Sequence, residues 1–157
     1  MPPLSPPPPA ESAAIAVIDT NVLLDWLVFE DPSAAALGKA VVTGQLRWIG
    51  TAAMLAEWAD VLARSVFDER AARRPIAATL VERHCVLLAD PSVPAAGRLL
   101  CSDADDQKFI DLAMTHPSRW LFSRDKALLR LARKARPRGV EVLTPSAWAA
   151  LGAPPRG

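Results

Sequence analysis

The sequence has no tyrosine, only two histidines and two cysteines, and a formal net charge of +1 over its 157 residues. Cys85 and Cys101 form no Cys-x-x-Cys pair, so the sequence predicts neither a zinc knuckle nor a disulfide framework. His84 and His116 lie far from the acidic residues in sequence, which argues against a histidine-rich metal site. The balanced charge predicts no global attraction to a polyanion, although a local basic patch can still provide one.

The sequence also shows no signal peptide and no apolar run long enough to cross a membrane. We therefore expect a reduced, cytoplasmic protein without a membrane partner. Its composition is that of a globular protein, because 51% of the residues are hydrophobic and 22% are charged. A chain of this length fits one domain that can bury a sizeable core.

Proline marks the two ends of the chain. It lacks a backbone donor and fixes φ, so the Pro-rich residues 1–12 can form neither a helix nor a central strand. We expect a disordered tail there, with a polyproline ligand for a recognition domain as the alternative. A flexible tail is also predicted at 153–157, which leaves 13–152 as a single domain.

Between the tails, short apolar runs alternate with longer segments of helical periodicity. Strands are predicted at 15–18, 46–50, 85–88, 119–123 and 140–143. Helices are predicted at 21–28, 33–43, 52–68, 75–83, 104–115, 125–135 and 145–150. This alternation predicts an α/β fold with a doubly wound parallel sheet and helices on both of its faces.

Four carboxylates stand near the ends of predicted strands or early in predicted helices: Asp19, Glu57, Asp106 and Asp125. The carboxyl ends of parallel strands form the functional edge of an open α/β sheet. If these acids meet there, their repulsion makes the site unfavourable until a divalent cation fills it. Hard oxygen ligands suit Mg²⁺ or Mn²⁺ rather than zinc. The set therefore predicts metal-dependent phosphodiester chemistry.

Each acid also has a purely structural interpretation. Asp19 and Asp125 can simply cap the helices that follow them. Asp19 directly follows a buried strand, where a charge is costly unless it is compensated. Thr20 and Asn21 can hydrogen-bond Asp19 or the following turn. Capping explains one acid at a time, but it does not explain why four of them occupy similar edges.

The segment that opens the helix at 104–115 carries three acids, Asp103, Asp105 and Asp106. The positive end of a helix dipole accounts for such charges, and it explains Asp105. Three like charges still repel each other, and a bound cation would relieve them. Apolar residues at i+3, i+4 and i+7 from Asp106 bury one face of the helix, so we expect Asp111 to point outward into solvent.

Taken together, these segments resemble the PIN domain family. The segments are Ile18-Asp19-Thr20-Asn21-Val22-Leu23-Leu24, Glu57 inside a helix, Asp103-Ala104-Asp105-Asp106 with Phe109 and Ala113, Leu121-Phe122-Ser123-Arg124-Asp125-Lys126-Ala127-Leu128-Leu129, and Val140-Glu141-Val142-Leu143-Thr144-Pro145-Ser146-Ala147-Trp148. The resemblance covers about residues 15–150 and implies a three-layer α/β/α sandwich whose central parallel sheet has four to five strands. It also implies a Mg²⁺- or Mn²⁺-dependent ribonuclease.

The resemblance carries over to individual residues. Asp19, Glu57, Asp106 and Asp125 match the family's four acids, and Asp103 matches an extra acid of one branch. The implied catalytic and metal ligands are therefore these residues, with Asp19 and Asp106 holding a cation directly and Asp125 and Glu57 acting through water or a second ion. Thr20, Asn21 and Ser123 match polar support positions. Two departures are mild, because Ala104 stands where that branch often has proline and Ser123 where threonine is common.

Many bacterial members of this family are toxins of type II toxin–antitoxin pairs, the VapC-type proteins. The resemblance therefore implies two partners, an RNA substrate and a cognate antitoxin protein. A homodimer is a further expectation, because Trp26 and Trp58 can serve a subunit interface, although core packing explains them equally well.

Cations crowd the segment after Asp125, at Lys126, Arg130, Arg133 and Lys134. A solvated helix face accounts for such a stripe, but its position beside Asp125 favours salt-dependent contacts with RNA phosphates. A different class of function is also open, namely a non-catalytic RNA- or protein-binding module on the same fold. A haloacid-dehalogenase-like phosphatase is disfavoured, because Asn21 stands where a second aspartate would be needed.

Overall fold

The computed structural model describes residues 13–116 and 118–151, so both predicted tails lie outside the described residues. Five strands form one parallel sheet in the order β3-β2-β1-β4-β5. The strands are β1 (Ala14–Ile18), β2 (Leu46–Thr51), β3 (Cys85–Leu88), β4 (Trp120–Phe122) and β5 (Glu141–Leu143). In the central strand β1, Val17 lies opposite Ile49 of β2 and Leu121 of β4.

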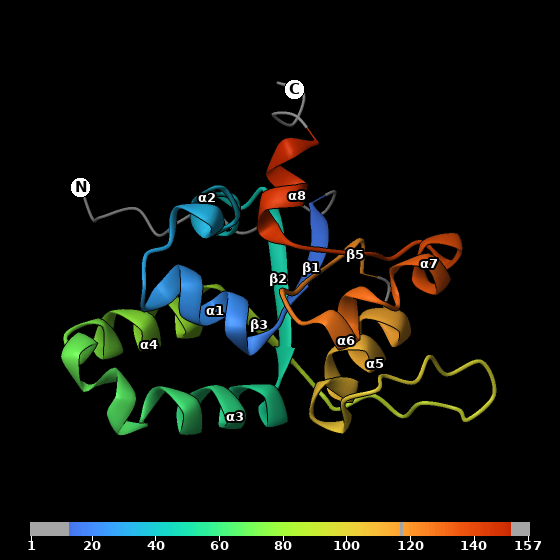
Figure 1. Ribbon diagram of the computed structural model, residues 1–157, viewed down its shortest axis with the longest axis horizontal. Coiled ribbons are helices and arrows are strands. Elements are labelled where there is room, and N and C mark those ends of the chain that lie inside the picture. The colour runs from blue at the N-terminus through green and yellow to red at the C-terminus, as the bar shows by residue number, and fades with distance from the viewer. Residues whose placement is uncertain (1–12, 117, 152–157) are drawn as a thin grey trace, which may run out of the picture.

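Helices cover both faces of this sheet (Figure 1). One layer contains α1 (Thr20–Leu27), α2 (Ala35–Val42), α3 (Ala52–Leu62), α4 (Arg73–His84) and α8 (Pro145–Ala150). The other contains α5 (Gln107–Thr115), α6 (Lys126–Leu129) and α7 (Ala132–Ala135). This arrangement confirms the α/β/α sandwich with a parallel sheet. Among the described helices, none is both long and apolar enough to cross a membrane.

The two faces of the sheet carry two separate hydrophobic cores. Side chains alternate along a strand, so Ala16 and Ile18 of β1 face one core and Val17 faces the other. In the first core Trp58 is 4% exposed, and Trp26 packs edge-on against Trp48 with ring centroids 5.6 Å apart. Core packing therefore accounts for Trp26 and Trp58.

Two predicted helices are shorter or broken. The helix predicted at 52–68 ends at Leu62, because Arg64 is extended and a 3-10 turn, η2 (Ser65–Arg70), follows. The guanidinium of Arg74 donates to the carbonyl oxygens of Leu62 (2.8 Å) and Arg64 (3.1 Å), which satisfies acceptors that the ended helix leaves open.

The helix predicted at 125–135 divides into α6 and α7, followed by a 3-10 turn, η4 (Arg136–Arg138). At the division the amide of Leu131 donates to the carbonyl of Leu128, three residues back, in place of the four-residue spacing of an α-helix. Two further 3-10 turns, η1 (Pro32–Ala34) and η3 (Ala104–Asp106), precede α2 and α5.

Candidate metal centre

The strand order places the ends of β1 and β4 side by side. The chain runs from β1 outward to β2 and β3, and then returns to build β4 and β5 on the opposite side of β1. Such a reversal of strand order opens a crevice at the carboxyl ends of the strands, where ligands bind in open α/β sheets. Asp19 follows β1 directly, and its amide donates to the carbonyl of Phe122, the last residue of β4 (3.0 Å). Asp125 lies three residues after Phe122 on the same edge.

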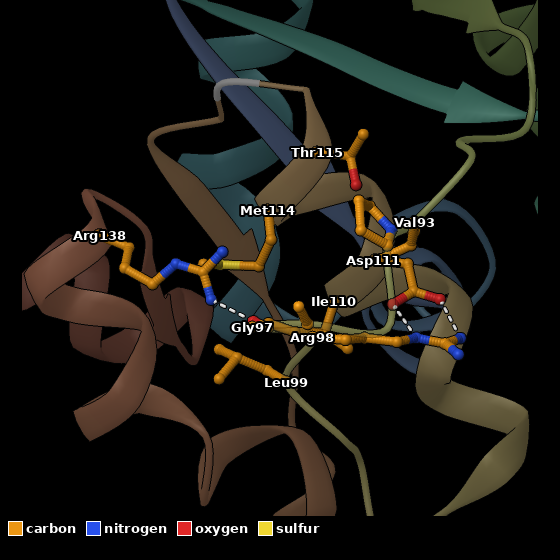
Figure 2. Close-up of a pocket in the computed structure, with 11 residues that line it drawn as sticks. Val93, Gly97, Arg98, Leu99, Ile110, Asp111, Met114, Thr115 and Arg138 are labelled. Atoms are coloured by element: carbon orange, nitrogen blue, oxygen red, sulfur yellow. Dashed lines mark hydrogen bonds and ion pairs between the residues drawn. The ribbon is translucent and has the colours of Figure 1, made fainter.

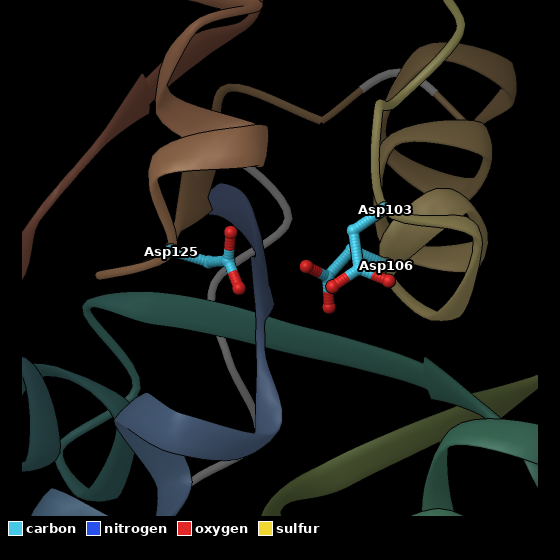
Figure 3. A group of neighbouring side chains, drawn as sticks. All are labelled: Asp103, Asp106 and Asp125. Atoms are coloured by element: carbon cyan, nitrogen blue, oxygen red, sulfur yellow. The ribbon is translucent and has the colours of Figure 1, made fainter.

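Three carboxylates converge at this edge: Asp103, Asp106 and Asp125. Each offers one oxygen, and the three oxygens all lie within 4.8 Å of one another. In Figure 3, Asp103 and Asp106 project from the start of α5 toward Asp125 at the start of α6. The group thus joins two segments that are distant in sequence. Of the four acids expected to converge, it contains Asp106 and Asp125, and Asp103 is its third member.

Asp106 is the least compensated member of this group. Its Oδ2 atom is buried and has no hydrogen-bond partner among the described residues. Burial raises the pKa of Asp106 to about 7, and the facing carboxylate of Asp125 and the charges of Asp103 and Asp19 add to the rise. An unpartnered buried carboxylate oxygen is costly unless a positive charge approaches it. The donor set, three carboxylates at short range, therefore fits a hard divalent cation such as Mg²⁺ or Mn²⁺ held by Asp103, Asp106 and Asp125.

Asp19 lies beside this group and is only 2% exposed. Its Oδ1 accepts from the amide of Val22 (2.9 Å), so Asp19 caps α1, and its Oδ2 accepts from the hydroxyl of Ser123. Burial outweighs these hydrogen bonds and the nearby Arg124, and it raises the pKa of Asp19 to about 6. The capping interpretation is confirmed, and the same carboxylate also contributes charge to the acidic edge.

Asp125 caps the next helix in the same manner. Its Oδ1 accepts from the amide of Ala127 (2.7 Å), while its own amide donates to Ser123 Oγ (2.9 Å). Ser123 therefore contacts both Asp19 and Asp125, as its predicted support position implies. Thr20, another predicted support residue, bonds Glu57 instead. Asn21 is exposed, and among the described residues its side chain bonds none of the predicted acids.

Glu57 stands apart from the three-carboxylate group. Its Oε2 accepts from the hydroxyl of Thr20, and its Oε1 lies 2.6 Å from the Nζ of Lys108. Lys108 is not among the predicted site residues. No spacing in the sequence signals it, because residues i and i+2 of a helix do not share a face, and the contact with Glu57 depends on the packing of α3 near α5.

The loop that supplies Asp103 is tied to α5 by side chains. The amide of Cys101 donates to Gln107 Oε1 (2.8 Å), and Gln107 Nε2 donates to the carbonyl of Leu99 (2.8 Å). Gln107 Nε2 also reaches Asp111 Oδ1 (2.9 Å), which binds Arg98. The side-chain amide of Gln107 therefore fixes the backbone just before Asp103 through one accepted and one donated hydrogen bond.

The expectation that Asp111 points into solvent is wrong. Asp111 is 9% exposed and accepts two hydrogen bonds from Arg98, at 3.1 and 2.7 Å (Figure 2). The loop at 89–103 covers this part of α5 and gives Arg98 access to it. A pocket of about 180 Å³ lies beside the pair, and Arg138, one of its lining residues, donates to the carbonyl of Gly97 (2.7 Å).

The four predicted RNA-binding cations, Lys126, Arg130, Arg133 and Lys134, are all exposed. Within the ranges 13–116 and 118–151, none of them forms an ion pair. They follow Asp125 directly, on α6, α7 and the turn between them. The neighbouring Arg124 is held differently, because it pairs with Asp25 of α1, which is 6% exposed. These four cations are therefore available to a polyanion at the edge of the acidic group.

Comparison with known proteins gives one family match. The model of the family described as "PIN domain" matches residues 15–127, which is more than half of the chain. The matched range extends from β1 into α6 and contains Asp19, Glu57, Asp103, Asp106 and Asp125. No curated protein matches the chain.

Proposed function

The chain belongs to the PIN domain family, and on this premise we propose that it is a Mg²⁺- or Mn²⁺-dependent endoribonuclease. One observation carries the proposal: Asp103, Asp106 and Asp125 bring oxygens within 4.8 Å of one another, and one oxygen of Asp106 is buried without a partner. A divalent cation held there would supply a Lewis acid for a phosphoryl oxygen and would lower the pKa of a water molecule.

The residues divide into those that hold the ion and those that orient them. Asp103, Asp106 and Asp125 present the oxygens. Ser123 fixes Asp19 and the backbone of Asp125, so both acids keep their orientation at the sheet edge. The buried Asp19 adds negative charge beside the ligands, and its role as a direct ligand stays a prediction.

The substrate surface of this proposal is the cationic segment Lys126, Arg130, Arg133 and Lys134. These side chains are exposed and begin immediately after Asp125. They would contact RNA phosphates on the approach to the acidic group, and binding would therefore weaken as salt rises.

We further infer the toxin of a type II toxin–antitoxin pair, restrained by a cognate antitoxin protein. The resemblance of the acid-bearing segments to VapC-type proteins supports this assignment. A short adjacent reading frame with a DNA-binding motif would strengthen it. Neutralisation of the ribonuclease by the product of that frame, measured with purified proteins, is its direct test.

The ribonuclease proposal is tested by cleavage of an end-labelled single-stranded RNA with Mn²⁺ or Mg²⁺, with and without chelator. The variant Asp106→Asn should cut about 100-fold more slowly or not at all, because it removes a ligand charge. Asp60→Asn is the matched control, since Asp60 is an exposed carboxylate of α3. Equal cleavage by Asp106→Asn and the parent protein would refute the proposal.

The alternative class, a non-catalytic binding module, gives a different result in the same assay. It predicts metal-independent RNA binding without cleavage. The buried, unpartnered oxygen of Asp106 argues against it, because a binding module gains nothing from an uncompensated acid.

A further inference from the structure

Glu57 has both carboxylate oxygens engaged by side chains of this chain. Thr20 at the start of α1 donates to Oε2, and Lys108 of α5 donates to Oε1 at 2.6 Å. The three acids that share a site, Asp103, Asp106 and Asp125, do not include it. The contacts of Glu57 are thus those of a residue that holds a cationic side chain.

Lys108 is held from two directions. Its ammonium group donates to Glu57 and to the carbonyl oxygen of Asp105, and its side chain is 26% exposed. An ammonium has three donor hydrogens, so one donor remains for another acceptor. Asp105, whose carbonyl accepts from Lys108, lies between Asp103 and Asp106, so the ammonium group is held next to the segment that supplies two of the three acids.

The ion pair joins the two helical layers. Glu57 comes from α3, whose Trp58 packs in the first core, and Lys108 comes from α5, whose Phe109 packs in the second. In Figure 1 these helices stand on opposite sides of the lower edge of the sheet. The pair thus links the two layers, and Thr20, the residue after Asp19, donates to Glu57.

A fixed cation near the acidic group would reduce its repulsion of a phosphate. Asp19, Asp103, Asp106 and Asp125 repel an incoming phosphodiester, and a divalent ion offsets only part of their charge. The exposed cations that follow Asp125 can contact phosphates on approach, but no acid fixes their position within the described ranges. Lys108 differs, because the carboxylate of Glu57 and the carbonyl oxygen of Asp105 fix its position beside the segment that carries Asp103 and Asp106.

We propose that Glu57 and Thr20 hold the ammonium group of Lys108 at the rim of the acidic site, where Lys108 contacts a phosphate of the substrate. This inference rests on the proposed ribonuclease function. It makes Lys108 a substrate-binding residue and Glu57 a positioning residue that acts through Lys108, in place of the metal-binding role that the family resemblance implies for Glu57.

The first test is Mn²⁺ binding to the full chain, measured by isothermal titration calorimetry without RNA. Asp106→Asn should bind Mn²⁺ about 100-fold more weakly, because a ligand is lost. Glu57→Gln should stay within about threefold of the parent, because it removes only a more distant and partly screened charge. Lys108→Met should bind Mn²⁺ no more weakly than the parent. A loss in Glu57→Gln as large as that in Asp106→Asn overturns the proposal.

The second test is RNA affinity as a function of salt, with Asp106→Asn in every protein to prevent cleavage. Adding Lys108→Met should weaken binding of a short single-stranded RNA about tenfold. It should also reduce the slope of log K against log salt by about 0.7, the value for one phosphate contact to a single strand. Lys108→Arg should restore the slope. Arg47→Met is the control, since Arg47 is exposed near the amino end of β2, at the opposite edge of the sheet.

The double variant distinguishes positioning from independent binding. If Glu57 acts through Lys108, Glu57→Gln alone should weaken RNA binding. Added to a protein that already carries Lys108→Met, it should weaken binding no further. An unchanged salt slope in Lys108→Met, or additive losses in the double variant, overturns the proposal. A parent protein that neither binds nor cleaves RNA overturns the proposed function and the phosphate contact together, while the Mn²⁺ titration still decides whether Glu57 holds the ion.

Discussion

Ser123 donates its hydroxyl hydrogen to Asp19 across 104 residues of sequence, and both side chains are buried. The same oxygen accepts from the amide of Asp125 at 2.9 Å. One hydroxyl therefore fixes the ends of β1 and β4 to each other and sets the orientation of two acids. This small contact is central to the geometry of the site.

Removing that hydroxyl should cost stability and activity together. Ser123→Ala leaves Asp19 Oδ2 and the amide of Asp125 without their partner, and a buried unsatisfied group costs about 1–3 kcal/mol. Ser123→Thr keeps the hydroxyl and should retain most of the cleavage rate. Urea unfolding and RNA cleavage measure the two effects. A Ser123→Ala protein that matches the parent in both would show that the hydroxyl has no such role.

Without metal, the protein should become less stable as pH rises from 5 to 8. Burial raises the pKa of Asp19 to about 6 and that of Asp106 to about 7, both from 3.8. Between the unfolded and folded pKa values the folded state binds more protons, so stability falls with increasing pH. For the buried Asp19 the effect is roughly 3 kcal/mol, and it is complete above the folded pKa.

Thermal unfolding in the presence of a chelator measures this dependence. Asp19→Asn and Asp106→Asn should each flatten it and should raise the melting temperature at pH 8, because each removes an ionising buried group. Asp25, whose pKa burial also raises, contributes in the same direction, so each variant is compared with the parent. Added Mn²⁺ should stabilise the parent most at high pH. A parent whose melting temperature rises with pH under chelation would contradict the assignment.

Gly38 lies in α2, and replacing a glycine inside an ordinary helix by alanine stabilises the protein. At Gly38 we expect the opposite effect. A Cβ at Gly38 would lie 2.2 Å from Nε1 of Trp26, whose ring packs against Trp48. Gly38→Ala should therefore destabilise the protein by about 1–3 kcal/mol, as overpacked cores do. The Mn²⁺ affinity of the folded protein should not change. Unfolding in urea gives the first result, and calorimetry the second.

The sheet was predictable because short apolar runs such as 15–18 and 46–50 alternate with helical periodicity. Local hydrogen bonding was predictable as well: Asp19 and Asp125 cap the helices that follow them, as their positions after strands indicated. These features depend on neighbours in sequence. The rule that acids at the carboxyl edge of a parallel sheet share one crevice indicated that Asp106 and Asp125 meet, but it did not select Asp103 as the third acid of the group in place of Asp19 and Glu57.

Other contacts depend on long-range geometry that no periodic pattern encodes. The Glu57–Lys108 pair joins residues 51 positions apart on different helical layers. Asp111 was expected in solvent because the helix pattern takes no account of the loop at 89–103, which brings Arg98 over it. The division between α6 and α7 follows a local three-residue hydrogen bond at Leu131 that the apolar spacing does not reveal.

Gln107 should control the metal affinity through Asp103. Its side chain binds the backbone of Leu99 and Cys101 at 2.8 Å each, and so fixes the segment that leads into Asp103. Residues that orient a metal ligand typically change affinity 10–100-fold, and we expect Gln107→Ala to weaken Mn²⁺ binding about tenfold. In an Asp103→Asn background the same substitution should have little further effect, since the ligand that it positions is already lost. Gln45→Ala is the matched control, because Gln45 is exposed ahead of β2. Additive losses in the double variant would instead indicate that Gln107 acts on the fold as a whole. Amide hydrogen exchange separates the two cases, because Gln107→Ala should speed exchange only at residues 97–103 if it acts locally.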